Sequence, residues 1–277
     1  MSCGPDTPDC QGVCRTVAAM SPVRSATTLA LWASAWLRGE SADDVLAAVD
    51  ETGQRAGVRA ASAAVAEATG LPGPGSPSAG SVDLLPLLAR GGLPELLLPH
   101  AGDLRGLPPG GDVTVPALDS GAVVVLPELD LGLVPVDGQW RAYRCPGRRV
   151  PAAPVFEALQ LIDEAIAQAT RELVTADIAR GPEQVREQVR DIMLAEAVHC
   201  PPGTPGRASA LLAKAISLEA LLRVAAGHQT AAVTSRELAV VDDALRPLSL
   251  AVRAGRRSAV DHAVQALAGS AAGRICR

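Results

Sequence analysis

Aromatic residues are scarce in this chain, with three tryptophans, one tyrosine and one phenylalanine among 277 residues. Proteins hold unpaired nucleotides largely by stacking them on aromatic rings, so single-stranded nucleic acid has little to bind here. The net charge of -5 points the same way, because neutralising phosphates requires clustered cations. The core must therefore be aliphatic, and with 48% hydrophobic residues the chain has ample material for one.

Motifs of the common enzyme classes are also missing. The sequence contains no Walker loop, no G-x-S-x-G elbow and no H-E-x-x-H zinc motif. The glycine-rich stretch 71–80 cannot be a dinucleotide loop, because no strand precedes it and its prolines lack the N–H groups that bind phosphate. We interpret it as a linker and expect no cofactor. The missing motifs weaken the case for an enzyme without removing it.

The six cysteines form no recognisable framework. Cys3, Cys10 and Cys14 lie within residues 1–24, which lack periodicity and which we interpret as a disordered tail. Their spacing matches no common zinc pattern and no histidine lies nearby, so we expect no metal. No secretion signal precedes them, and no apolar run reaches the roughly 20 residues of a membrane span. We therefore expect a soluble cytoplasmic protein with no membrane contact.

The chain from residue 25 to residue 53 favours two helices. Leu29, Trp32 and Trp36 recur at helical spacing, and we expect the tryptophans in the core, with a binding surface as the alternative. Ser41 is placed to cap the second helix. Residues 54–69 are ambiguous, and we interpret them as an alanine-rich helix.

A small sheet is predicted next. Short apolar runs punctuated by Gly, Pro and Asp predict strands at 96–98, 122–126, 131–136 and 140–144. Asp137-Gly138 separates the last two runs and predicts a hairpin.

Residues 151–270 follow helical spacing throughout. Breaks at Gly181, 199–203 and Gly227 divide them into four amphipathic segments, which together predict an antiparallel helical bundle. The expected fold class is therefore α+β, with a mixed region (25–150), a bundle (151–270) and a short tail (271–277). The patterns leave open whether the two regions share one core.

The densest group of polar residues follows the first predicted strand. His100, Asp103 and Arg105, with Asp112 further on, share one glycine-rich loop. Arg105 and the loop backbone are suited to a small anion, with His100 or Asp103 as a general base. The alternative is a structural turn in which Asp103 bonds backbone N–H groups. These three residues are the candidate catalytic or ligand-binding set.

Positive charge gathers at the end of the chain, with six arginines and one acid between residues 246 and 277. Arg253, Arg256 and Arg257 are spaced i, i+3 and i+4, so they share one face of the last predicted helix. That face is suited to an acidic protein surface, or to phosphates in a weaker alternative of nucleic-acid association. A solvated helix face is the structural alternative.

Four segments resemble a family of actinobacterial proteins of unknown function: TTLALWASAWLRGESADDVL, GDLRGLP, LGLVP and ALRPLSLAVR. A single lysine, the absence of asparagine and the abundance of arginine and alanine agree with a high-GC bacterial genome. The resemblance implies no catalytic residues.

We therefore expect a non-enzymatic interaction or regulatory protein that binds a protein partner or forms a homo-oligomer. An enzyme or ligand binder at His100, Asp103 and Arg105 is the alternative.

Overall fold

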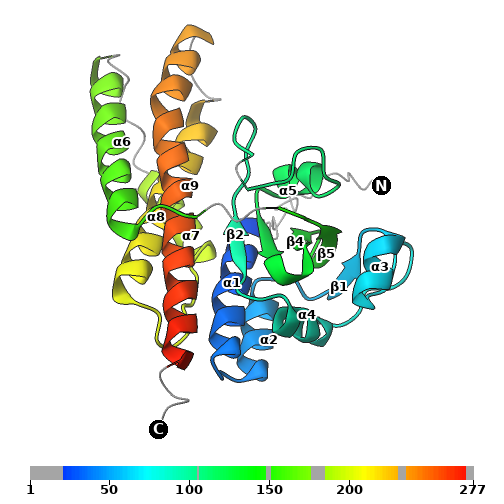
Figure 1. Cartoon of the computed structure of the whole chain (residues 1–277). Helices are drawn as coiled ribbons and strands as arrows, with labels where there is room; N and C mark the ends of the chain where they lie inside the picture. Colours follow the sequence, from blue (N-terminus) through cyan, green and yellow to red (C-terminus); the bar gives the residue numbers. More distant parts are fainter. Residues whose placement is uncertain (1–20, 105, 148–150, 176–184, 230–234, 273–277) are drawn as a thin grey trace, which may run out of the picture.

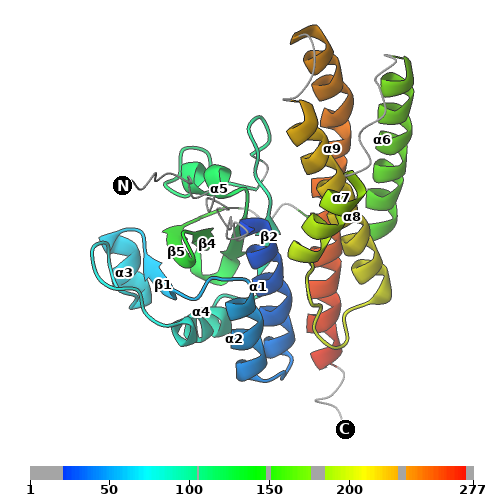
Figure 2. The same ribbon diagram turned by 180° about the vertical axis from the view of Figure 1, so that it is seen from behind.

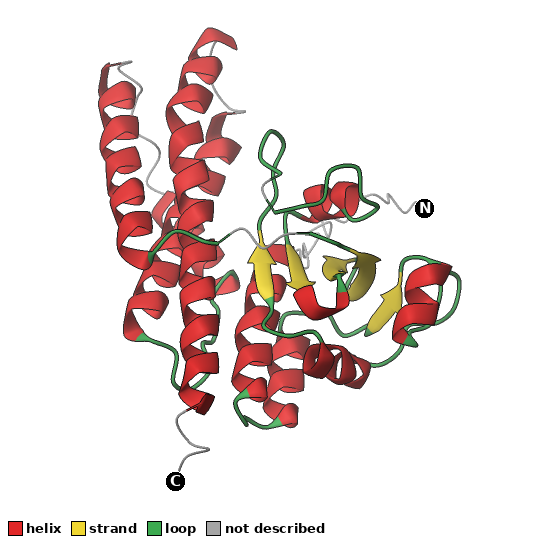
Figure 3. Ribbon diagram, in the orientation of Figure 1, coloured by secondary structure: helices red, strands yellow, loops and turns green. Residues whose placement is uncertain are grey.

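The computed structural model describes residues 21–104, 106–147, 151–175, 185–229 and 235–272. A mixed region comes first and a helical region second (Figure 1 and Figure 3). The elements of the mixed region are α1 (Pro22–Leu37), α2 (Ala42–Glu51), β1 (Val58–Ala60), α3 (Ala63–Thr69), the 3-10 turn η1 (Ser81–Asp83), α4 (Leu84–Arg90), β2 (Glu95–Leu97), α5 (Thr114–Ser120), β3 (Val123–Leu126), the 3-10 turn η2 (Pro127–Leu129), β4 (Leu131–Val136) and β5 (Gln139–Arg144). The helical region holds α6 (Val155–Thr175), α7 (Val185–Ala195), α8 (Gly206–Gln229) and α9 (Ser235–Ala272). This arrangement confirms the predicted α+β class.

Helix α1 begins earlier than predicted. Ser21 caps it by accepting a hydrogen bond from the Arg24 backbone N–H at 3.3 Å, and Pro22 occupies the first turn, where its missing N–H costs nothing. Residues 21–24 are thus part of an ordered helix start, and the predicted tail boundary at 24 is wrong. Residues 1–20 lie outside the described residues.

The sheet has five strands in the order β1-β5-β4-β3-β2. β1 runs parallel to β5, and the remaining pairs are antiparallel. The predicted hairpin joins β4 to β5, with positive φ at both Asp137 (50°) and Gly138 (74°), as a type I′ turn requires. This local signal is confirmed.

The segment 54–69 is not one helix. It supplies strand β1 and the short helix α3. The stretch 71–80 then returns along the outer edge of β1: Val58 and Ala79 exchange two backbone hydrogen bonds of 2.9 Å, and the Ala60 N–H donates to Pro72 at 2.9 Å. The predicted linker therefore covers a strand edge that would otherwise present unpaired backbone groups.

One hydrophobic core joins the two regions. It contains Leu29 from α1, Leu133 from the sheet, Ile162 from α6 and Val264 from α9. Trp32 and Trp36 are half-buried and pack against it. Helix α9 lies alongside α1 in both views, between the sheet region and the remaining helices (Figure 1 and Figure 2).

Candidate functional site

The loop that contains His100 and Asp103 is a tight turn. The His100 N–H donates to the Asp103 carbonyl at 3.1 Å, and the Asp103 N–H donates to the His100 carbonyl at 2.8 Å. Gly102 occupies the left-handed position of this turn, with φ +86°. The exposed His100 ring directs Nδ1 at the Ala101 carbonyl, 2.7 Å away, within the same turn. Backbone geometry therefore accounts for the pairing of His100 with Asp103.

The third member of the candidate set, Arg105, lies outside the described residues. Asp112, further along the same loop, is exposed. Among the residues that the structure describes, no group of three or more His, Cys, Asp or Glu side chains is placed to hold a metal ion.

The three arginines of α9 do not form one exposed face. Arg253 is half-buried and its Nη2 donates to the Leu98 carbonyl at the end of β2. Arg256 is 1% exposed, and Arg257 is half-buried with an interaction of its own. The helical spacing is right, but neighbouring elements occupy the surface on which Arg256 was expected to be free.

Arg256 belongs to an ion network of four side chains, in which Arg256 and Glu196 are buried while Glu219 and Arg223 are partly exposed. Its Nη2 forms an ion pair with Glu219 Oε2 at 2.9 Å, and no hydrogen bond joins the two groups. The other carboxylate oxygen of Glu219 accepts a hydrogen bond from Arg223 at 2.9 Å, and Arg223 also donates to Glu196 at 2.5 Å. Glu196 follows α7 directly and is 3% exposed. Two arginines and two glutamates thus connect the end of α7 to α8 and α9.

Burial and charge act on this network in opposite directions. Desolvation lowers the pKa of Arg256, and the charges of Glu219 and Glu196 oppose that shift. In Arg223, burial alone would lower the pKa, but Glu196 and Glu219 outweigh it and raise the pKa. Both guanidinium groups remain charged at neutral pH, since arginine does not lose its proton in proteins. The network is neutral as a whole and functions as a structural junction.

The connection between α7 and α8 is fixed along α1 by three side chains of that helix. Arg24 donates to the Ala197 carbonyl at 2.9 Å, Trp32 to His199 at 2.9 Å and Arg38 to Pro202 at 2.5 Å. The indole of Trp32 therefore has a structural role between the two regions.

The described thiols are poorly suited to nucleophilic chemistry. Burial, followed by the charges of Asp130 and Glu95, raises the pKa of Cys145 to about 11. Burial also raises the pKa of Cys200, which lies in the α7–α8 connection beside the exposed His199. Because the thiolate is the reactive form, the raised pKa disfavours nucleophilic reactivity in both groups.

Helix α7 differs from the rest of the described helical region because it buries none of its own residues. Val185, Val189 and Ile192 lie on one face of the helix. All three are half-buried, and α7 packs against α8. Leu194 points the other way and is 69% exposed, and Met193 is 37% exposed. Figure 2 shows α7 on the outside of the helical region. This outer face of α7 is the candidate site for a protein partner.

The sequence predicted neither the ion network nor the exposed face of α7, and the reason is the same for both. Glu219 and Arg223 are four residues apart on one helix, which is a readable signal. Their partners Glu196 and Arg256 come from other elements and carry no local pattern. A periodic apolar pattern cannot predict the exposure of Leu194 either, because that exposure depends on which surfaces the other helices cover.

Comparison with known proteins places the chain among mycobacterial relatives. It is 33% identical to the uncharacterized protein MT1533 and 32% identical to the uncharacterized protein Rv1486c, both of Mycobacterium tuberculosis, over 84% of this chain and 94% of each relative. It is 28% identical to the uncharacterized protein ML1804 of Mycobacterium leprae, over 84% of this chain and 95% of that protein. No solved structure matches the chain significantly.

None of the helices within the described ranges combines the length and apolar character that crossing a bilayer requires.

Two family models match consecutive parts of the sequence: the Rv1486c-like protein N-terminal domain matches residues 26–158, and the C-terminal domain matches residues 156–257. The resemblance noted in the sequence is thereby confirmed, and the chain belongs to the Rv1486c-like family of actinobacterial proteins.

Proposed function

We propose that this protein is a non-enzymatic interaction protein whose contact surface is the outer face of α7. The observation that carries the proposal is the exposure of Leu194 on a helix that buries no residue of its own. A single exposed leucine is ordinary on a protein surface. An eleven-residue helix with no buried residue is a less ordinary feature, because short helices are marginal without packing.

The junction at the end of α7 supports the same function. The buried Glu196 anchors the helix end in the ion network, and the α7–α8 connection is bonded to α1. The helix is therefore held in place while its outer face stays accessible. A rigid and accessible face suits recognition, because little ordering is lost when a partner binds. The two free thiols of the described chain, Cys145 and Cys200, agree with a reducing compartment, and we place the interaction in the cytoplasm.

The test is a quantitative co-purification of the tagged chain from an actinobacterial host, comparing the wild type with Leu194→Asp. A charged side chain at this position removes the apolar contact, so the partner should be lost. Val115→Asp in α5 is the matched control, because Val115 is also exposed and apolar but lies in the mixed region. Equal recovery of every bound protein by wild type and Leu194→Asp would refute this surface.

A further inference from the structure

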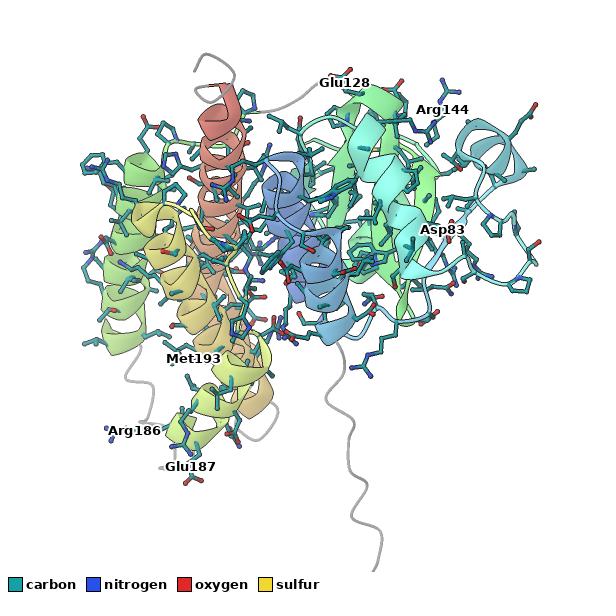
Figure 4. The ribbon with its side chains drawn as sticks, turned by 90° about the horizontal axis from the view of Figure 1, so that it is seen from below. Asp83, Glu128, Arg144, Arg186, Glu187 and Met193 are labelled. Atoms are coloured by element: carbon teal, nitrogen blue, oxygen red, sulfur yellow. The ribbon has the colours of Figure 1, made fainter. Side chains whose placement is uncertain are left out.

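The charges on α7 are sorted into two edges. At about 100° per residue, Arg186 and Arg190 lie on one side of Leu194, while Glu187 and Asp191 lie on the other. All four are exposed. Figure 4 shows Arg186 and Glu187 projecting from the outer end of α7 in different directions, away from the body of the molecule.

This sorting gives the helix itself little net stabilisation. Arg186 and Arg190 are four residues apart, as are Glu187 and Asp191, and like charges at that spacing are mildly destabilising, while Glu187 and Arg190, three residues apart, offset part of that cost. The ion pairs found among the described residues use none of the four. Among the residues that the structure describes, these four charges have no ion-pair partner and can meet a molecule outside the chain.

A second copy of the same helix is the complementary surface. When two α7 helices pack in parallel about a two-fold axis along their length, the arginine edge of each faces the acidic edge of the other. Arg186 and Glu187 differ by one residue, about 1.5 Å of rise, so the opposed charges lie at matching heights. In an antiparallel two-fold pair, arginine would face arginine and acid would face acid. Charge complementarity thus favours a second copy of α7 as the partner and favours the parallel orientation over the antiparallel one.

We propose that two copies of this chain associate through α7 in a parallel, two-fold arrangement, with the two Leu194 side chains in contact near the C-terminal ends of the helices. Arg186 faces the partner's Glu187, and Arg190 faces the partner's Asp191. This inference rests on the proposed function and names the partner of that same face. One helix pair is a small contact, so the dimer is reversible, dependent on concentration and weakened by salt.

Sedimentation velocity of the full chain tests this arrangement with two charge-reversed variants. Arg186→Glu with Arg190→Glu makes the face wholly acidic, and Glu187→Arg with Asp191→Arg makes it wholly basic. Each variant alone should associate at least about tenfold more weakly than the wild type, because like charges then face each other. An equimolar mixture of the two should recover a dimer, since acidic and basic faces are complementary.

The matched control reverses Asp243 and Arg246, an exposed ion pair on α9 in the same helical region, and should leave association unchanged. Circular dichroism checks that helix content is kept, and the recovery in the mixture excludes unfolding as the cause of the loss. A wild type that stays monomeric at every concentration, a dimer insensitive to both reversals, or a mixture that stays monomeric would each overturn the parallel dimer. A monomeric wild type that still retains a different protein in a Leu194-dependent manner would overturn the dimer and leave the proposed function standing.

Discussion

Helices α7 and α9 belong to the same helical region and have opposite relations to it. Helix α9 packs against α1, α6 and α8, and it buries even the guanidinium of Arg256. Helix α7 buries nothing of its own and exposes Leu194. An arginine is inside and a leucine is outside, because burial is decided by the neighbours that a residue acquires rather than by its hydropathy. The difference separates the part of this region that maintains the fold from the part available for binding.

The largest expected effect is at the buried arginine. Arg256→Ala removes the buried cation of the network and leaves Glu219 and Glu196 to share Arg223, so we expect it to lower the free energy of unfolding by about 3–5 kcal/mol. Urea denaturation measures the change. Arg190→Ala on α7 is the matched control and should alter stability by less than about 0.5 kcal/mol. If the two substitutions have similar effects, the comparison between the helices fails.

Two leucines give the second contrast. Leu267 in α9 is fully buried, and Leu267→Ala should cost about 2–5 kcal/mol through lost contacts and a residual cavity. Leu194→Ala removes the same atoms from an exposed position and should change stability by less than about 0.5 kcal/mol. Thermal denaturation of both variants provides the measurement. A large loss of stability in Leu194→Ala would show that the outer face of α7 is covered in solution.

The sequence predicted the parts of this fold that depend on near neighbours. Two such features depend on only a few neighbouring residues, and both are present: the hairpin at Asp137-Gly138 and the apolar face of α7 formed by Val185, Val189 and Ile192. Strand β1 was missed because three residues carry no period, and its pairing partner β5 lies about eighty residues away in the chain.

The candidate site followed the same rule. The spacing of Arg253 and Arg256 correctly predicts neighbouring positions on a helix, but it cannot predict that Glu219 and Leu98 meet them there. The polar composition around His100 is equally compatible with a turn and with a ligand loop, because both use glycine and short polar side chains.

A smaller effect concerns how closely α9 packs. A Cβ at Gly255 would lie 2.6 Å from Ile162 Cδ1, so Gly255→Ala should destabilise the protein by about 1 kcal/mol in spite of the better helix propensity of alanine. At Gly269, in the same helix, a Cβ meets nothing within 4 Å. Gly269→Ala should therefore be neutral or stabilising by up to about 1 kcal/mol. Opposite signs for the two substitutions, measured by urea denaturation, would show that α9 is packed tightly along one part of its length and open along another.

An effect of similar size is expected where the two regions are joined. Trp32→Phe keeps the aromatic bulk against the core but removes the indole N–H that donates to His199, so it should cost about 0.5–1.5 kcal/mol. Its more specific consequence is local. Amide hydrogen exchange should rise in residues 197–203 while the sheet stays protected, because the α7–α8 connection loses one of its three bonds to α1. If exchange rises equally across the sheet, the indole stabilises the whole core and not the connection. If exchange is unchanged everywhere, Arg24 and Arg38 alone hold the connection, and the position of α7 depends on them.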